Sequence, residues 1–225
     1  MADDMRARIY AVADIHGKQN RLIAILKNID QWRPDVLVLA GDITGYTRAL
    51  KTVEALSSLS MPMLFVRGNT DRQHFDSLMA ALPTTQNLHL RPVEINGLSF
   101  VGVSGTLPLP FHSKIQFNEA DTVDRLGRLL TRASILVCHP PPMSVCDRVG
   151  GRYHAGSRAI YNLVVKHKPA VVICGHIHEA CGSGFLTGVR IVNCAMAEDH
   201  EGVLMDIQDD LNTTLTWLPT TSDEG

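Results

Sequence analysis

The stretch VLVLAGD, residues 36–42, joins a short apolar run to a glycine and an aspartate. The run VLVLA has the length and composition of a strand that is buried on both faces. The Gly-Asp pair follows directly, where the chain must leave the strand. Gly and Asp are common turn residues, so the pair alone is consistent with a simple turn. The rest of the chain decides whether it marks a site.

Apolar runs of strand length recur through the sequence. They occupy residues 9–13, 36–40, 63–66, 99–103, 135–138, 171–174, 189–193 and 203–207. Apolar residues with helical spacing lie between the early runs, within residues 22–29, 50–59, 123–130 and 160–164. Strands that alternate with helices predict an α/β fold with parallel strands. The last part, from about residue 180, shows strands without helices, which predicts an antiparallel end to the sheet system.

Length and composition favour one globular domain that spans residues 1–225, with 45% hydrophobic and 20% charged residues. The net charge of −2 gives no strong nucleic-acid signal. No apolar run reaches the roughly 20 residues of a membrane helix, so no membrane partner is expected. The five cysteines form no CxxC pair, and Cys138 and Cys174 lie inside apolar runs. These features, with a charged start unlike a signal peptide, predict a cytoplasmic protein.

Polar side chains follow five of the apolar runs. In chain order they are Asp14 and His16, Asp42, Asn69, His139, and His176 with His178. Sites in α/β proteins lie at the carboxyl ends of the strands, so these side chains can converge. Gly41, Gly68 and Gly175 precede three of them and would let the backbone approach the site closely. His139 and His178 are expected at loop edges rather than in the core.

Each motif alone is weak, because a Gly-Asp pair is usually a turn and a buried His is usually a hydrogen-bonded core residue. Their joint occurrence at strand ends favours a metal site. Asp, His and an Asn carbonyl suit Mn²⁺, Fe²⁺ or Zn²⁺. Seven side chains exceed the needs of one catalytic ion. Two divalent ions about 3.5–4 Å apart that share one carboxylate account for them.

These ordered motifs resemble those of the calcineurin-like metallophosphoesterases. The resemblance implies a four-layer fold, a two-sheet β-sandwich flanked by helices, with the site at one edge. It implies that Asp14, His16, Asp42 and His178 bind the first ion. It implies that Asp42, Asn69, His139 and His176 bind the second, with Asp42 bridging and a metal-bridging hydroxide as nucleophile. The run HPPP at 139–142, with HAGS at 154–157, further resembles small phosphodiesterases grouped with bacterial cyclic-nucleotide phosphodiesterases.

Thr70 departs from the family pattern. In much of the family a His follows the Asn, donates a proton or contacts phosphate, and is oriented by the next carboxylate, here Asp71. Asp71 is therefore a candidate catalytic residue. Thr70 cannot act as an acid near neutral pH. Thr70 with Gln73 also matches a capping box, which predicts that Thr70 begins a helix and that Asp71 lies in its first turn.

Two long loops, residues 104–114 and 139–157, are candidate substrate loops. His154 is a candidate catalytic residue, and Arg148, His112 and Asn69 are candidate substrate contacts. The alternative for His154, Arg148 and His112 is that they are ordinary solvated loop residues.

The sequence thus predicts a dimetal-dependent hydrolase of a small phosphoester, most simply a phosphodiesterase, with a nucleotide as one candidate substrate. A phosphomonoesterase or protein phosphatase would use the same site. A non-catalytic scaffold of the same fold is the remaining alternative, although such scaffolds usually lack ligands and every ligand position here is filled. The oligomeric state stays open.

Overall fold

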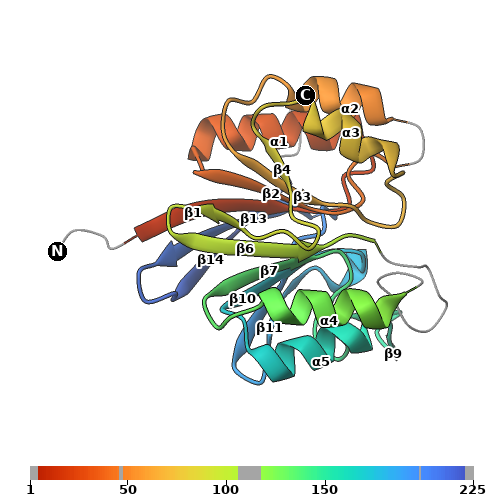
Figure 1. Ribbon diagram of the computed structural model, residues 1–225. Coiled ribbons are helices and arrows are strands. Elements are labelled where there is room, and N and C mark those ends of the chain that lie inside the picture. The colour runs from red at the N-terminus through yellow and green to blue at the C-terminus, as the bar shows by residue number, and fades with distance from the viewer. Residues whose placement is uncertain (1–4, 46–47, 106–117, 198, 221–225) are drawn as a thin grey trace.

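The computed structural model describes residues 5–45, 48–105, 118–197 and 199–220. The elements form four layers, with two β-sheets packed face to face in the middle and helices on both outer faces (Figure 1). Each of the two sheets has six strands. The predicted two-sheet sandwich flanked by helices is therefore confirmed.

The first sheet begins with four parallel strands. These are β1 (Met5–Val12), β2 (Val36–Ala40), β3 (Met63–Val66) and β4 (Thr85–Asn87). Strands β13 (His200–Gln208) and β14 (Thr213–Pro219) continue it antiparallel beyond β1. Helices α1 (Gln19–Trp32), α2 (Ala49–Leu56) and α3 (His74–Ala80) cover its outer face.

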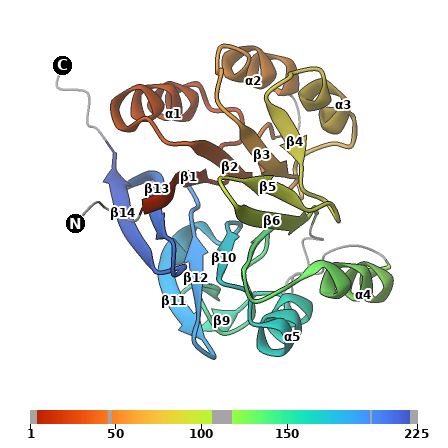
Figure 2. The ribbon, with the colours of Figure 1, turned by 60° about the vertical axis from the view of Figure 1, so that its left-hand side comes forward.

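The second sheet has the order β11-β12-β10-β7-β6-β5. Its strands are β5 (Val93–Ile95), β6 (Leu98–Val103), β7 (Ser134–Cys138), β10 (Val171–Cys174), β11 (Gly182–Leu186) and β12 (Val189–Asn193). Helices α4 (Glu119–Leu129) and α5 (Arg158–His167) cover the face of this sheet that points away from the first sheet (Figure 2). Strand β11 runs antiparallel to β12. The antiparallel end predicted for the last part of the chain is thus confirmed in both sheets.

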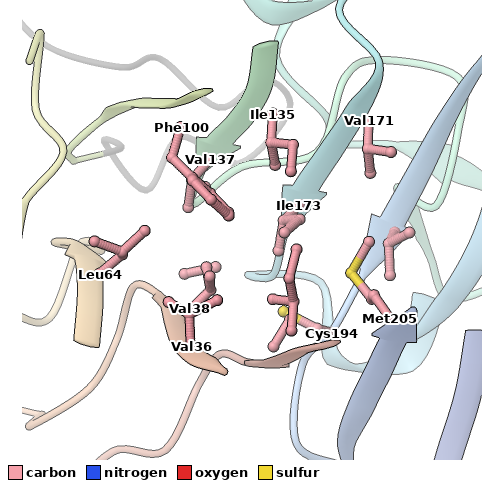
Figure 3. Close-up of a cluster of buried hydrophobic side chains, with 14 of the residues drawn as sticks. Val36, Val38, Leu64, Phe100, Ile135, Val137, Val171, Ile173, Cys194 and Met205 are labelled. Carbon is pink, nitrogen blue, oxygen red and sulfur yellow. The ribbon is translucent and has the colours of Figure 1, made fainter. Parts of the chain in front are cut away.

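The apolar core lies between the sheets, where side chains from both inner faces meet (Figure 3). Val38 of β2 points into this core, whereas its neighbours Leu37 and Leu39 pack under α1 and α2. Successive strand residues point to opposite faces, so a strand with apolar neighbours on both faces needs an unbroken apolar run. This explains why VLVLA carries no polar residue.

Six strands were not predicted: β4, β5, β11, β14 and the hairpin β8 (Arg148–Val149) with β9 (Tyr153–His154). They are short or half-exposed elements at sheet edges or on a loop. A short 3-10 helix, η1 (His178–Ala180), follows β10. In the part of the chain that the structure describes, no helix is long and apolar enough to cross a membrane.

Candidate metal centre

Asp14 lies at the centre of the candidate site, just after β1, and its side chain is fully buried. Its Oδ1 is 3.0 Å from His178 Nε2, 3.9 Å from His16 Nε2 and 3.9 Å from His139 Nε2. Its Oδ2 accepts the main-chain N–H of His176 at 2.7 Å. Three imidazole nitrogens from both sheets therefore face one buried carboxylate oxygen.

Asp42, which follows the end of β2, faces two of the same histidines, His16 and His139. Its Oδ2 is 3.8 Å from His16 Nε2, and its Oδ1 is 3.5 Å from His139 Nε2. His139 Nε2 is also 3.2 Å from Asn69 Oδ1. The Nδ1 of His139 donates to the Ala40 carbonyl at 2.9 Å, so its Nε2 is turned toward the carboxylates.

The ligand atoms gather in two groups whose members all lie within 4.8 Å of one another. One group is Asp14, His16 and His178, and the other is Asp14, Asp42 and His139. Asp14 Oδ1 is buried, yet among the described residues it accepts no hydrogen bond of acceptable geometry. A cation would satisfy that oxygen and the nitrogens that face it, so these residues fit a divalent metal. The His176 ring packs against His139 with centroids 4.9 Å apart, which places His176 beside the second group.

Four of the candidate ligands have left-handed backbones. The φ angles are +60° for Asp14, +52° for His16, +51° for Asp42 and +73° for His176. Non-glycine residues rarely adopt this conformation, and each instance costs on the order of 1–3 kcal/mol. Main-chain bonds hold the strained segments, since His16 N–H donates to Asp42 O at 2.8 Å and Asp14 N–H donates to Gly41 O at 2.9 Å. Strain that is retained at one place in this way is typical of functional sites.

The three glycines next to the ligands lie against the ligand side chains. A Cβ on Gly68 would be 2.1 Å from Asp42 Oδ1, one on Gly41 would be 2.5 Å from His139 Nδ1, and one on Gly175 would be 2.6 Å from Asp14 Oδ2. All three distances are shorter than real Cβ contacts. The predicted close approach of the backbone at these positions is therefore confirmed.

Burial and mutual attraction set the charge states of the site without a cation. Burial alone would raise the pKa of Asp42, but His139, the Thr70 amide and His16 hold it well below its usual value. Burial opposes the charge on His139, but Asp42 and Asp14 raise its pKa to about 9. Burial and the neighbouring His139 lower the pKa of His176 to about 4, so His176 is neutral at pH 7 and can bind a metal.

Thr70 and Asp71 do not begin a helix. Helix α3 begins at His74 after Gln73, which makes no side-chain capping bond, so the predicted capping box is wrong. Thr70 is almost fully buried, its N–H donates to Asp42 Oδ1 at 2.8 Å, and its Oγ1 is 3.5 Å from His16 Nδ1. The structure thus places Thr70 beside the candidate ligands.

Asp71 binds main-chain amides instead of lying in a helical turn. Its carboxylate accepts from Gly68 N at 3.0 Å, Ile43 N at 3.1 Å, and Thr44 N and Oγ1 at 2.8 and 2.9 Å. These amides explain its burial, because a carboxylate out of water needs several donors. Asp71 therefore binds the amides of these loops instead of lying in the first turn of a helix.

The candidate residues of loop 139–157 contact their own loop. His154 Nδ1 donates to the buried Asp147 Oδ1 at 2.6 Å, and Asp147 Oδ2 accepts from Ser144 N and Gly156 N. Arg148 Nη1 donates to Gly151 O at 3.2 Å. Asp147 therefore organises the loop, while catalytic and substrate roles for His154 and Arg148 stay predictions. His112 lies outside the described residues.

His139 is fully buried, which corrects the expectation that it lies at a loop edge. The side chain of His178 is 47% exposed, in agreement with that expectation. The two histidines differ in their distance from the sheet: His139 directly follows β7 and its ring lies against the turn after β2, whereas His178 lies four residues beyond β10, at the start of η1.

Two residues that hold the main chain of the site were not predicted from the sequence. Arg21 of α1 donates from Nη1 to the main-chain carbonyl of Asp14. Asn193, fully buried at the end of β12, donates from Nδ2 to the carbonyls of Ile177 at 2.9 Å, Ala180 at 3.1 Å and Cys146 at 3.3 Å. Asn193 also ends an apolar run, so the pattern that identified Asn69 was present there. Nothing in the sequence singles out Arg21.

This chain is similar to known proteins in sequence and in fold. The chain is 27% identical over 182 residues to an uncharacterized protein of Methanocaldococcus jannaschii, covering 77% of this chain and 81% of that protein. It is 23% identical over 192 residues to a probable cyclic nucleotide phosphodiesterase of Synechococcus, covering 80% and 72%. The crystal structure of TT1561 of Thermus thermophilus shares the fold, with a TM-score of 0.71 at 17% identity over 94% of this chain and 98% of that one. The family model described as calcineurin-like phosphoesterase matches residues 7–180, and the chain belongs to this family.

Proposed function

We propose that this protein is a dimetal hydrolase that prefers phosphodiesters. The observation that carries the proposal is the buried Asp14 Oδ1, which faces three imidazole nitrogens and accepts no well-formed hydrogen bond among the described residues. The two groups of candidate ligands both include Asp14. One ion in each group would account for the five side chains of the two groups.

Asp42 is the candidate bridging ligand. One of its oxygens faces His16 of the first group, and the other faces His139 of the second. The Thr70 amide holds Oδ1 in place, and the glycine at position 68 leaves room for the carboxylate. Asn69 Oδ1, beside His139, completes the second group. When bound, two such metal ions supply an activated water near neutral pH and neutralise charge on a phosphate.

The diester preference rests on Thr70. Thr70 lies beside His16 and occupies the sequence position at which much of the family has a histidine. A threonine hydroxyl cannot protonate a leaving group near neutral pH. A diester with an acidic leaving alcohol needs less proton donation than an alkyl monoester. The name of the Synechococcus relative, a probable cyclic nucleotide phosphodiesterase, supports the same preference.

Metal analysis and a matched pair of variants test this proposal. The protein is stripped with chelator and reloaded with Mn²⁺, Fe²⁺ or Zn²⁺, and we expect two ions per chain and hydrolysis of bis(p-nitrophenyl) phosphate. Asp42→Asn should reduce hydrolysis to the background rate, because an amide cannot bridge two cations as a carboxylate does. Asp30→Asn, the same change on the exposed side of α1, is the control and should keep full activity. Wild-type rates in Asp42→Asn would refute the dimetal reading.

A further inference from the structure

Two cavities extend from the candidate metal centre along α1. The nearer one, of about 520 Å³, is lined by the candidate ligand His178 together with Lys18, Arg21 and His200. The farther one, of about 460 Å³, is again lined by Lys18, Arg21 and His200. Because these lining residues are shared, the cavities form one groove, called here the α1 groove. It leads away from His178.

The α1 groove carries a row of cations. All three line its farther cavity: Lys18 directly precedes α1, and Arg21 and Lys27 belong to the helix. None of the Lys or Arg ion pairs found among the described residues involves any of the three. Helix α1 also begins without a side-chain cap and without an acidic residue in its first turn, which leaves its positive end uncompensated.

The acidic residues of the α1 groove are largely occupied elsewhere. Glu179 accepts from the Gly150 amide at 2.9 Å, on the side of loop 139–157. Glu201 is almost fully buried and accepts from Asn28 at 2.9 Å. Asp199 is the remaining carboxylate among the described lining residues. The exposed charge of the groove is therefore mainly positive.

The far part of the α1 groove also has an apolar wall. Its exposed part is Ile23, a large side chain that is 56% exposed, while Ala24 and Met196 also line it but are buried. An aliphatic wall next to unpaired cations suits an organic group that carries an anion. A bare inorganic phosphate would leave the apolar wall in contact with water.

We infer that the α1 groove binds the organic part of the substrate together with a second phosphate, so that the substrate class is a phosphodiester with an additional phosphate group, such as a nucleotide ester. This inference rests on the proposed function. The ester to be cleaved lies at the metal centre, the organic part lies on Ile23, and Lys18 and Lys27 supply charge for the second phosphate. Arg21 is also held by the Asp14 carbonyl, so the lysines are the cleaner test.

Two substrates that differ by one phosphate test the inference. They are the p-nitrophenyl ester of thymidine 5′-phosphate and the same ester with a 3′-phosphate added. In the Mn²⁺-loaded enzyme the bisphosphate ester should have the higher kcat/KM, by about tenfold, and the advantage should shrink at high salt. The double variant Lys18→Gln/Lys27→Gln should remove this advantage. Lys166→Gln/Lys168→Gln removes the same charge from two exposed lysines at the end of α5, on the other side of the molecule, and should keep it.

The outcomes separate the inference from the proposed function. If neither ester is cleaved, the proposed function fails. If both are cleaved with equal kcat/KM in the wild type, the proposed function stands and the second-phosphate site is refuted. A loss of the preference that is as large in Lys166→Gln/Lys168→Gln as in Lys18→Gln/Lys27→Gln would also refute the site, because the effect would then be one of net charge.

Discussion

The two halves of the metal centre are held by different chemistry. On the first sheet, the charged side chain of Asp71 gathers the amides of Gly68, Ile43 and Thr44, which belong to the loops after β2 and β3. These bonds hold the segments that carry Asp42 and Asn69. The organising group is an anion, and all its partners are donors.

On the second sheet, the neutral side chain of Asn193 also holds loops together, but it acts mainly as a hydrogen-bond donor. Its amide nitrogen binds the carbonyls of Ile177, Ala180 and Cys146, and its Oδ1 accepts from Ala195 N at 3.1 Å. A carboxylate could not bind three carbonyls. Each half of the site therefore depends on one buried polar residue, which is an Asp where the loops present N–H groups and an Asn where they present C=O groups.

The two halves can first be separated through their ligands. His139→Ala and His178→Ala should each reduce metal content from two ions toward one, and should lower kcat/KM by more than about 100-fold. Only His139→Ala should also destabilise the metal-free fold, by about 2 kcal/mol, because His139 is buried and bonded to Ala40 whereas His178 is half-exposed. Denaturation with chelator present measures this difference.

Chelator is needed because bound metal itself stabilises the folded state. If both variants melt like the wild type without metal, burial of His139 does not matter to the fold. If His178→Ala unfolds, this histidine is structural rather than a ligand.

Asp71→Ala should have the largest effect on stability alone, about 3 kcal/mol of unfolding free energy. It leaves several buried amides without an acceptor. Each unpaired amide costs about 1–3 kcal/mol, and water that enters the site relieves part of that cost. Asp71→Asn should lie between Ala and wild type, since one amide oxygen remains as an acceptor. Urea denaturation measures both. An Asp71→Ala protein as stable as the wild type would show that water replaces the carboxylate without loss.

Asn193→Ala should destabilise by about 2 kcal/mol, somewhat less than Asp71→Ala, because carbonyls tolerate a lost partner better than amides do. Asn193→Asp should be worse than Asn193→Ala, because it sets a carboxylate against three carbonyl oxygens. This order reverses the one expected at Asp71, where the change of similar shape, Asp71→Asn, is milder than Asp71→Ala. The same stability order at both positions would break the contrast in polarity between the two halves.

The fold was predictable from its interior strands. Runs such as VLVLA are unmistakable because both of their faces are buried. Strand β4, with the sequence TQN, has no such signal, because it lies at a sheet edge and all its residues are partly exposed. The candidate ligands were identifiable because each follows an interior strand.

The supporting residues were harder to predict, since they act through main-chain groups that the sequence does not display. Thr70 and Gln73 match a capping box by spacing, yet the Thr70 amide binds Asp42 instead. Asp71 likewise binds loops that come from another part of the chain. Local patterns cannot weigh such long-range partners, and for this reason the helix-cap prediction failed while the ligand positions converged.

Thr70→His is the change with the smallest expected effect, and it tests the first half of the site against the family pattern. Thr70 caps no helix, so the substitution loses no capping energy, but Thr70 is almost fully buried beside His16 and the larger ring must find room. A well-aligned general acid is worth about 10²–10⁴-fold. Because alignment here is imperfect, we expect the rate on glycerol phosphate relative to bis(p-nitrophenyl) phosphate to rise only about tenfold.

Thr70→Gln is the matched control for this prediction, because it has similar bulk but no titratable group, and the ratio of the two rates should not rise in it. A rise in Thr70→Gln as large as in Thr70→His would attribute the change to shape rather than to proton donation. The wild-type ratio is equally informative. If the unmodified enzyme already cleaves glycerol phosphate as fast as the aryl diester, another group donates the proton. His154, held by Asp147, would then be the first residue to replace, and the diester preference would be withdrawn.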